Sequence, residues 1–288
     1  MADTPPGTLV RRTLGFRALH ERGDGFVMPN AWDAGSAIVL ARQGFASIAT
    51  TSAGIAFSLG CPDHRIPEGG RRVSRTQMFD RIREITDAVE VPVNGDLEDG
   101  YGARPEAVAD TIRLAIQVGL AGGNIEDHAD GSLYDIEDAA ERIAAAHESA
   151  AQLGTGFVLT ARTDGLLLDP DASLDDAIRR ANRYREAGAD CLYVPGVNDL
   201  ARIATLVREI DGPLNVVMGL GGGGLTVDAL REIGVARLSL GGTIARAALG
   251  FVRDSARELR TRGTLEFAAA QFSQSELNSI FSERTRPG

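Results

Sequence analysis

Short apolar segments recur along the chain, and most of them are followed by a segment with helical periodicity. Continuous apolar runs of this length are typical of strands that are buried on both faces. The eight runs span residues 26–31, 46–52, 91–98, 122–127, 157–164, 190–196, 213–219 and 235–242. Segments with helical periodicity lie between them at residues 75–89, 105–119, 136–153, 174–188 and 200–210.

Alternation of strands and helices predicts a parallel sheet with right-handed crossovers. Eight such units in roughly 250 residues fit a closed (β/α)₈ barrel of the TIM type. An open, doubly wound sheet is the alternative, but no Gly-x-Gly-x-x-Gly motif follows the first run. We therefore predict an α/β protein with one barrel domain over residues 1–288, in which residues 24–262 form the barrel proper.

Two segments lie outside the eight units. Residues 8–23 predict an amphipathic N-terminal helix, and residues 263–288 predict a C-terminal extension that is helical over 264–283. This extension has more apolar surface than a lone surface helix needs. It packs either on another subunit or on its own barrel, and the sequence favours neither. Its large apolar residues are Phe267, Phe272, Leu277, Ile280 and Phe281.

The composition excludes several classes of partner and location. The net charge of −10 argues against binding to nucleic acid or to an anionic membrane. No apolar stretch approaches the ~20 residues that cross a bilayer. The first residues lack the basic and apolar regions of a signal peptide, so a cytoplasmic location is expected. Cys61 and Cys191 lie far apart in the chain and are expected to be reduced thiols.

All 30 basic residues are arginine. Without lysine, no side chain can form a Schiff base with a carbonyl substrate, and no Walker-type lysine is present. Carbanion chemistry in this chain would therefore depend on a metal ion or on hydrogen-bond donors.

The strongest chemical signal follows the third run, where residues 94–102 read Asn-Gly-Asp-Leu-Glu-Asp-Gly-Tyr-Gly. Alternation along a strand puts Asp96 and Glu98 on one face. Two adjacent carboxylates repel each other unless a cation or a proton lies between them. The fourth run ends with Glu126, and active sites of (β/α)₈ enzymes lie at the C-terminal ends of the strands. Three carboxylates there predict a site for Mg²⁺, with Mn²⁺ as a possible substitute.

Other strand ends add to the predicted mouth of the barrel. Arg162 ends the fifth strand and is a candidate anion clamp, or a charge partner for the acids. Asn215 lies on the seventh strand. Asp99 and Asp127 should point away from the lumen by alternation, as caps or supporting partners.

His128 lies in the loop after the fourth strand, at residues 128–134, which we expect to move. It is a candidate acid or base, and a solvated loop histidine is the alternative. The glycine-rich stretches 219–224 and 241–242 follow strands seven and eight, where barrels often bind phosphate. Flexible turns would leave the same sequence pattern.

Several motifs in register resemble the isocitrate lyase/phosphoenolpyruvate mutase superfamily, from about residue 16 to residue 262. The resemblance is strongest to the subgroup described as carboxyphosphonoenolpyruvate mutase-like or methylisocitrate lyase-like. The matching stretches lie at residues 29–33 (PNAWD), 49–54 (ATTSAG), 59–63 (LGCPD), 91–102 (VPVNGDLEDGYG), 124–127 (NIED), 161–164 (ARTD) and 235–242 (VARLSLGG).

The resemblance implies a barrel whose last helix is exchanged between subunits, in homodimers or homotetramers. It also implies Mg²⁺ held by Asp96, Glu98 and Glu126, partly through water. A small 2-oxo or 2-hydroxy acid would bind to the metal, to Arg162 and to groups near Thr51, Ser52 and Ala53. Asp63 corresponds to an acid near the metal and the reacting atom, and Asn215 is a further substrate-binding candidate.

The departures from the superfamily bear on the reaction. Isocitrate and methylisocitrate lyases have a Lys-Lys/Arg-Cys-Gly-His loop after the fourth strand, whereas residues 126–134 read EDHADGSLY, without cysteine. The Glu-Asp-Lys motif and the following Asn-Ser pair of phosphoenolpyruvate mutases are also missing. After the sixth strand, where lyases have Glu and mutases have His, residues 192–196 read LYVPG.

Three functions remain open. The first is a metal-dependent carbon–carbon lyase or decarboxylase that acts through a pyruvate-type enolate. Decarboxylation needs no acid for its leaving group, because CO₂ leaves as a neutral molecule. The second is a mutase or hydrolase of phosphonopyruvate-type substrates, and the third is a barrel that binds a metabolite without turnover. Three acids that repel one another at one mouth argue against a silent site.

Overall fold

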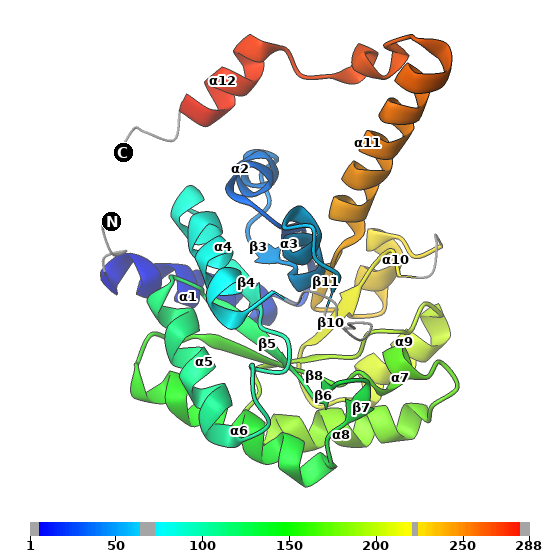
Figure 1. Cartoon of the computed structure of the whole chain (residues 1–288). Coiled ribbons are helices and arrows are strands. Elements are labelled where there is room, and N and C mark those ends of the chain that lie inside the picture. Colours follow the sequence, from blue (N-terminus) through cyan, green and yellow to red (C-terminus); the bar gives the residue numbers. More distant parts are fainter. Residues whose placement is uncertain (1–5, 64–72, 221–223, 283–288) are drawn as a thin grey trace.

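A ring of parallel strands surrounded by helices forms the body of the protein (Figure 1), as the alternating pattern predicts. The computed structural model describes residues 6–63, 73–220 and 224–282. The neighbouring strands run in the order β1-β11-β10-β9-β8-β5-β4-β3-β2. These strands are β1 (Phe26–Met28), β2 (Asn30–Ala31), β3 (Ile48–Thr50), β4 (Val93–Asp96), β5 (Gly122–Glu126), β8 (Val158–Arg162), β9 (Cys191–Tyr193), β10 (Leu214–Val217) and β11 (Arg237–Ser239).

The first barrel strand is split by Pro29 into β1 and β2. Proline has no backbone N–H and so interrupts the ladder of hydrogen bonds. Its carbonyl still accepts from Ala49 N at 2.9 Å. Because β1 pairs with β11 and β2 pairs with β3, the two halves together close the ring. The fold is therefore the predicted closed (β/α)₈ barrel and not an open sheet.

The five predicted inter-strand helices are all present, each ending within two residues of the prediction. Several of these helices have an N-cap residue whose side chain accepts a hydrogen bond from a backbone N–H of the first turn. Ser173, for example, accepts from Asp176 N, and Asp175 and Asp176 lie in the first turn, where acids favour the helix dipole. The helices around the barrel are α2 (Ala34–Arg42), α3 (Ser52–Ser58), α4 (Arg75–Ala88), α5 (Pro105–Gln117), α6 (Ile136–Gln152), α7 (Gly165–Leu168), α8 (Leu174–Glu186), α9 (Leu200–Glu209) and α10 (Val227–Glu232).

Helix α1 (Pro6–Glu21) covers the N-terminal end of the barrel, two residues earlier in the chain than predicted. Its Phe16 and Leu19 are buried in a cluster with residues from the strands: Phe26, Met28, Ala49, Ala121 and Val158. Arg17 Nη1 pairs with Asp190 Oδ1 at 2.7 Å, which attaches the helix to the start of β9. The N-terminal end is thus filled, and the opposite end is left for a site.

The loop after β5 forms a short antiparallel pair, β6 (His128–Ala129) and β7 (Ser132–Leu133). Asp130 and Gly131 connect the two strands with φ angles of 50° and 83°. Positive φ at both turn positions is the requirement of a type I′ hairpin, and Asp-Gly is a preferred sequence for it. The segment that we expected to be a moving loop forms a hairpin in this structure, and its motion stays a prediction.

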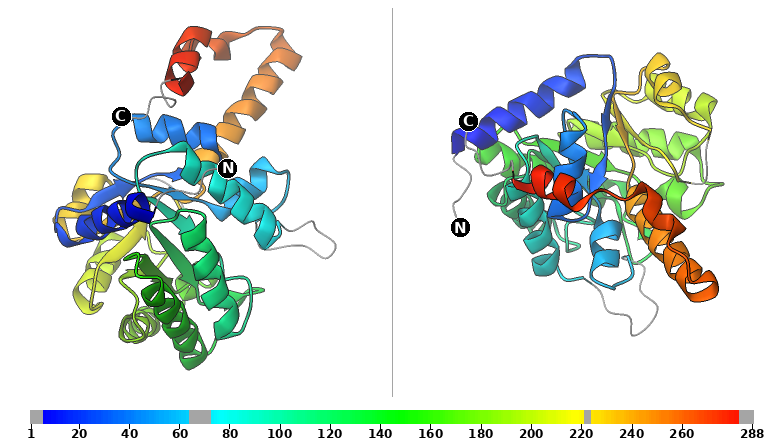
Figure 2. Two further views of the ribbon diagram at one scale, coloured as in Figure 1. Left: turned by 90° about the vertical axis from the view of Figure 1, so that its left-hand side faces the viewer. Right: turned by 90° about the horizontal axis from the view of Figure 1, so that it is seen from above.

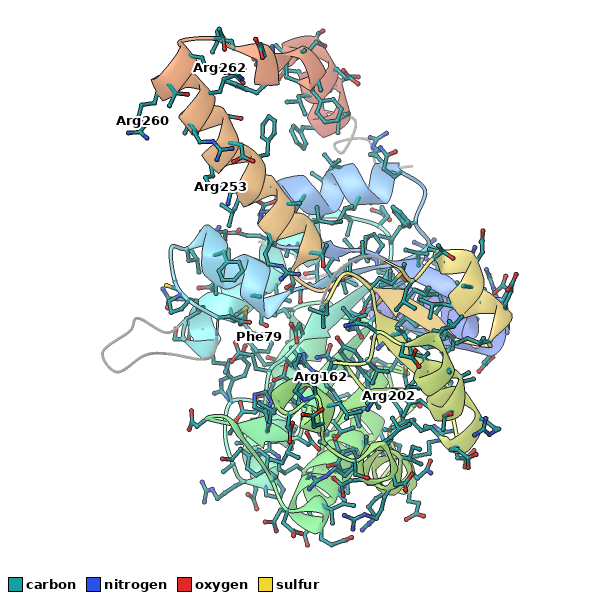
Figure 3. The ribbon with its side chains drawn as sticks, turned by 90° about the vertical axis from the view of Figure 1, so that its right-hand side faces the viewer. Phe79, Arg162, Arg202, Arg253, Arg260 and Arg262 are labelled. Atoms are coloured by element: carbon teal, nitrogen blue, oxygen red, sulfur yellow. The ribbon has the colours of Figure 1, made fainter. Side chains whose placement is uncertain are left out.

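The C-terminal part of the chain projects from the barrel. Helix α11 (Thr243–Arg262) ends at Gly263, whose φ of 67° gives a left-handed cap. The 3₁₀ helix η1 (Glu266–Ala270) and helix α12 (Gln274–Ser282) follow, and α12 returns to lie beside α2 (Figure 2). Figure 3 shows Arg253, Arg260 and Arg262 on this projection, whereas Arg162 lies inside the barrel.

Large apolar side chains remain exposed along this projection. They are Leu249, Phe251, Val252, Leu259, Leu265, Phe272 and Phe281, each at least 40% exposed. Ile280 instead packs against the barrel core. No described helix is both long and apolar enough to span a bilayer. Cys61 and Cys191 are buried and form no disulfide, as expected.

We propose that the exposed apolar residues of the projection pack on a second copy of the chain. Deletion of residues 264–288 should then shift the protein to a smaller assembly in analytical ultracentrifugation, because part of the apolar contact between copies is lost. Substitution of Leu14 by Ser is the control, since Leu14 is a 56% exposed apolar residue on α1, which is not part of the projection. An unchanged mass after deletion would place the extension on its own barrel alone.

Candidate functional site

A cavity of about 280 Å³ opens at the C-terminal ends of the barrel strands. Most of the residues predicted for the site line it. The predicted residues in its wall are Thr51, Ser52, Ala53, Asp63, Asp96, Arg162 and Asn215. Glu98, Glu126 and His128 are not among the residues that line it, and each is at most 5% exposed. The sequence therefore predicted the cavity itself better than the buried layer that supports it.

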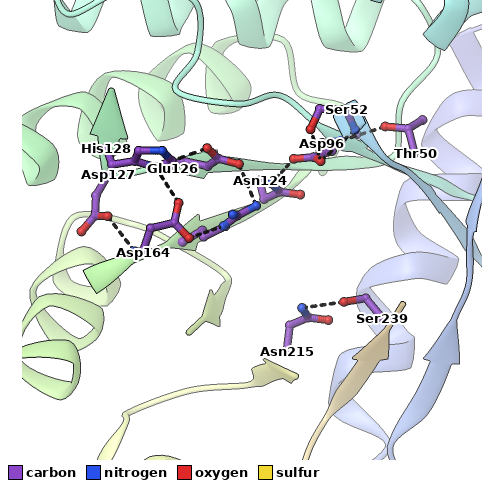
Figure 4. A network of polar contacts seen from close by, with 12 residues as sticks. Thr50, Ser52, Asp96, Asn124, Glu126, Asp127, His128, Asp164, Asn215 and Ser239 are labelled. Carbon is purple, nitrogen blue, oxygen red and sulfur yellow. Dashed lines mark hydrogen bonds and ion pairs between the residues drawn. The ribbon is translucent and has the colours of Figure 1, made fainter. Parts of the chain in front are cut away.

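Asp96 is held in place by donors from the neighbouring strand ends (Figure 4). Its Oδ2 accepts from Ser52 N at 2.9 Å and from Ser52 Oγ at 2.8 Å. Its Oδ1 accepts from Asn124 Nδ2 at 2.9 Å, and its own N–H donates to Thr50 Oγ1. Ser52 was predicted to bind substrate, but in this structure both of its donors are engaged by Asp96. Ser52 therefore positions the carboxylate.

The backbone at Glu98 differs from the prediction. Strand β4 ends at Asp96, and Glu98 has a φ of 49°, so strand alternation does not apply to it. Its carbonyl accepts from Glu126 N at 2.9 Å, which ties the turn after β4 to the end of β5. A non-glycine residue in this left-handed region is uncommon, and such residues concentrate at functional sites.

Arg162 lies between two buried carboxylates. Its Nη1 pairs with Glu126 Oε1 at 2.7 Å, and its Nε donates to Asp164 Oδ1 at 2.6 Å. Both roles considered for Arg162 are compatible with this geometry. The guanidinium is a charge partner of the acids, and its edge still lines the cavity.

The pKa values of this group follow from burial and charge. Burial raises the pKa of Glu126 well above its usual range, and the negative charges of Asp164, Asp96 and Glu98 raise it further against the opposing effect of Arg162. For Asp164, burial works in the same direction, but Arg162 and the hydrogen bond to His128 outweigh it and lower the pKa. The two carboxylates thus differ, although both touch one guanidinium.

His128 is buried, so the alternative of a solvated loop histidine is wrong. Its Nδ1 lies 2.7 Å from Asp164 Oδ2 and 3.5 Å from Glu126 Oε2. Hairpin β6–β7 holds the ring in this position. Since His128 does not line the cavity, its contacts here support the two acids, and its role as a catalytic acid or base stays a prediction.

Glu126, His128 and Asp164 form a second possible metal cluster, with ligand atoms within 4.8 Å of one another. Arg162 already neutralises this cluster, however, because its guanidinium contacts both carboxylates. A divalent cation would have to displace that contact. Asp96 faces the cavity without a cationic partner among its described contacts. Glu126 belongs both to this cluster and to the predicted set Asp96, Glu98 and Glu126, so its contact with Arg162 bears on both sets.

Asp99 and Asp127 have the supporting roles predicted for them. Asp127 accepts from Asp164 N at 2.9 Å and from Tyr184 Oη at 2.7 Å. Asp99 accepts from Tyr101 N at 2.9 Å. Each carboxylate fixes a turn or a neighbouring helix instead of facing the cavity.

Tyr193 is a wall residue that the sequence analysis did not single out. It ends β9, and its ring lies 5.2 Å from the Arg162 guanidinium carbon. Burial raises the pKa of Tyr193, so that the phenol keeps its proton at neutral pH and can donate a hydrogen bond. A signal was present in the sequence, because Tyr193 lies in the stretch 192–196 that departs from the superfamily pattern.

The floor of the cavity contains a second arginine that was not predicted. Arg237 begins β11 and is 1% exposed. It donates to Asn215 Oδ1 and Thr160 Oγ1 at 2.9 and 3.0 Å, and its Nη1 lies 3.2 Å from His20 Nε2. His20 Nδ1 lies 2.9 Å from the Phe16 carbonyl, which can only accept, so Nδ1 carries the proton and Nε2 accepts from Arg237.

The glycine-rich stretches give no support for a phosphate site. Gly241 and Gly242 line the cavity, but residues 221–223 of the other stretch lie outside the described residues. Gly219 has a φ of 85°, and a Cβ there would meet Thr243 Oγ1 at 2.8 Å. A turn requirement explains that glycine.

A closed barrel with acids and an arginine at the C-terminal mouth defines a class of enzyme-like (β/α)₈ proteins. A sequence profile described as phosphoenolpyruvate phosphomutase matches residues 16–260. The chain belongs to this family, within the superfamily that the sequence motifs resemble.

Individual relatives agree with this assignment. An uncharacterised protein of Mycobacterium tuberculosis, Rv1998c, is 38% identical over 85% of this chain and 88% of its own. The 2-methylisocitrate lyase of Escherichia coli K12 is 30% identical, over 69% of this chain and 67% of the lyase.

Solved structures share the fold. A lyase/mutase-type protein of Burkholderia cenocepacia J2315 is 45% identical, with a TM-score of 0.90 over 96% of this chain and 97% of that chain. An oxaloacetate acetylhydrolase solved with its product oxalate is 26% identical, with a TM-score of 0.84 over 95% and 94%. The family therefore contains lyases and mutases as well as hydrolases.

The buried His20 should make stability depend on pH. Burial, followed by the charge of Arg237, lowers the pKa of His20 from 6.5 to about 3. Below pH 6.5, His20 therefore binds a proton in the unfolded chain but not in the folded chain. The free energy of unfolding consequently falls as the pH drops from 6.5 towards 3. The slope from this residue is at most about 1.4 kcal/mol per pH unit. Urea unfolding of wild type and His20→Gln at several pH values measures it, and equal slopes would contradict the assignment.

Proposed function

We propose that this protein is a Mg²⁺-dependent lyase or decarboxylase of a small 2-oxo or 2-hydroxy carboxylic acid, acting through a pyruvate-type enolate. One observation carries the proposal: Asp96 faces a cavity at the barrel mouth beside Arg162, and the buried Glu126 contacts the same arginine. Relatives in the family that are 30% identical are 2-methylisocitrate lyases, which favours cleavage of a carbon–carbon bond.

The acids fit a hard divalent cation. Carboxylate oxygens are the ligands that Mg²⁺ prefers, and Mn²⁺ accepts the same set. The pKa of Glu126 is raised by burial and by the other carboxylates, so a positive charge beside Asp96 would relieve the repulsion. Asp96, Glu98 and Glu126 would hold the ion, in part through water. When bound, Mg²⁺ would act as a Lewis acid that stabilises developing negative charge on the substrate oxygen.

The other wall residues bind and orient the acid. Arg162 uses Nε and Nη1 for Asp164 and Glu126, which leaves Nη2 for the substrate carboxylate. Because Asp164 and Glu126 fix the guanidinium, Nη2 would hold that carboxylate in one orientation. Thr51 and Ala53 line the same wall. Asp63, in the loop after α3, also lines the cavity. We assign these three to contacts with the substrate.

The source of the proton that follows bond cleavage distinguishes this chain from its cysteine-containing relatives. The protonated phenol of Tyr193 lies in the wall beside Arg162, whereas His128 lies behind the wall. Tyr193 is therefore the better placed donor among the described residues. A decarboxylation would need a proton only at the enolate carbon, since CO₂ leaves as a neutral molecule.

An assay for pyruvate and CO₂ should detect turnover of at least one of oxaloacetate, methylisocitrate, dimethylmalate and phosphonopyruvate, and only with Mg²⁺. Asp96→Asn and Glu126→Gln should lower kcat/KM by at least about 100-fold because each removes a ligand charge. Both variants should keep the circular dichroism spectrum of the wild type. Full activity after exhaustive chelation would reject the metal–enolate proposal. Turnover of phosphonopyruvate alone would replace it with carbon–phosphorus chemistry.

Arg162→Lys should lower kcat/KM by about 10- to 100-fold, because lysine keeps the charge but loses the bidentate fork. Arg180→Lys is a matched control, since Arg180 pairs with Asp176 and Asp127 outside the cavity. Steady-state kinetics on the responding substrate compares the two. A loss no greater than that of the control would reassign Arg162 to the support of Glu126 and Asp164.

A further inference from the structure

Arg237 is a buried cation whose described partners are all neutral. Its three acceptors are the Asn215 amide, the Thr160 hydroxyl and the unprotonated nitrogen of His20. A guanidinium has five N–H donors, so two remain without an acceptor among the described residues. The same side chain lines the floor of the cavity.

The two arginines of the cavity differ in charge compensation. Arg162 contacts two carboxylates, whereas no ion pair joins Arg237 to any described carboxylate. Arginine keeps its proton in proteins, so the charge of Arg237 persists in the barrel. A buried charge without a counter-ion is costly. An anionic group of a ligand would offset that cost.

Arg237 also determines which atoms of the neighbouring wall residues donate and which accept hydrogen bonds. Because a guanidinium can only donate, Asn215 must turn its Oδ1 towards Arg237 and its Nδ2 away. Asn215 Nδ2 then donates to Ser239 Oγ at 3.0 Å. The Ser239 hydroxyl is left to donate its own proton, and no described residue accepts it. Asn215, Ser239 and Arg237 thus present donors only.

This donor wall lies across the cavity from the acids. Asn215 and Ser239 come from β10 and β11, whereas Asp96 and Asn124 come from β4 and β5 (Figure 4). One side of the cavity therefore suits a cation, and the other suits an anion. A ligand that fills both sides carries a group for the metal at one end and a negative charge at the other.

We propose that Arg237, together with Asn215 and Ser239, binds a second anionic group of the substrate, at the end remote from the acids. This inference rests on the proposed function only in treating the Asp96 side as the metal-dependent end. Arg237 would thus favour the binding of substrates with two anionic groups over substrates with one.

Malate and lactate provide a matched pair of probes, because both are 2-hydroxy acids and malate adds one carboxylate. In isothermal titration with Mg²⁺, wild type should bind malate at least about 10-fold more tightly than lactate, as one charge-assisted hydrogen bond would give. Arg237→Met should reduce malate affinity to that of lactate and leave lactate affinity unchanged.

Two further variants keep the test decisive. Asn215→Asp is nearly isosteric and places an acceptor towards the ligand, so it should also remove the preference for malate, even if Arg237→Met fails to fold. Arg142→Met is the control, because Arg142 is equally buried but donates to the carbonyls of Gly102 and Ala103 outside the cavity. This control should keep the preference.

The outcomes separate this inference from the proposed function. Equal affinity of wild type for malate and lactate, or a preference that survives both Arg237→Met and Asn215→Asp, overturns the assignment of Arg237 while Mg²⁺-dependent binding stands. If wild type binds neither acid in the presence of Mg²⁺, the proposed function itself fails, and the role of Arg237 falls with it.

Discussion

The contact of Arg162 with Glu126 and Asp164 is the interaction on which the rest of the mouth depends. Four carboxylates, Asp96, Glu98, Glu126 and Asp164, come together at the ends of β4, β5 and β8, where they repel one another. The guanidinium neutralises part of this charge from inside the barrel. Removal of one member of such a buried group leaves an uncompensated charge and typically costs several kcal/mol, about 3–5. The site can therefore be acidic only because it contains this arginine.

Much of the fold was predictable because it depends on local patterns. Apolar runs and helical periodicity located the strands and helices, and the rule for (β/α)₈ barrels placed Asp96, Arg162 and Asn215 at one mouth. Strand alternation failed at Glu98, where β4 had already ended and the backbone enters a left-handed conformation. Alternation is a property of extended backbone, so it could not predict the turn.

The role of Arg237 could not be predicted from the sequence for a different reason. Whether Arg237 meets Asn215, Thr160 and His20 depends on the stagger between strands and on the docking of α1, which no local pattern encodes. His128 differs from Arg237, because a local signal for its placement was present although its sequence context suggested a solvated loop. Its burial results from the Asp130-Gly131 hairpin, and that Asp-Gly pair was a readable signal.

Family membership and cavity chemistry constrain the reaction in different ways. The strand ends supply acids beside an arginine at the mouth. The choice of reaction depends on the proton donor and on the wall opposite the acids, and there this chain has Tyr193, Asn215, Ser239 and Arg237. Because donors face acids across a single cavity, a bound dianion would be held at both ends before any bond breaks. Such orientation favours cleavage between the two ends, since the charge left on the fragment near Asp96 and the charge on the remote group are stabilised separately.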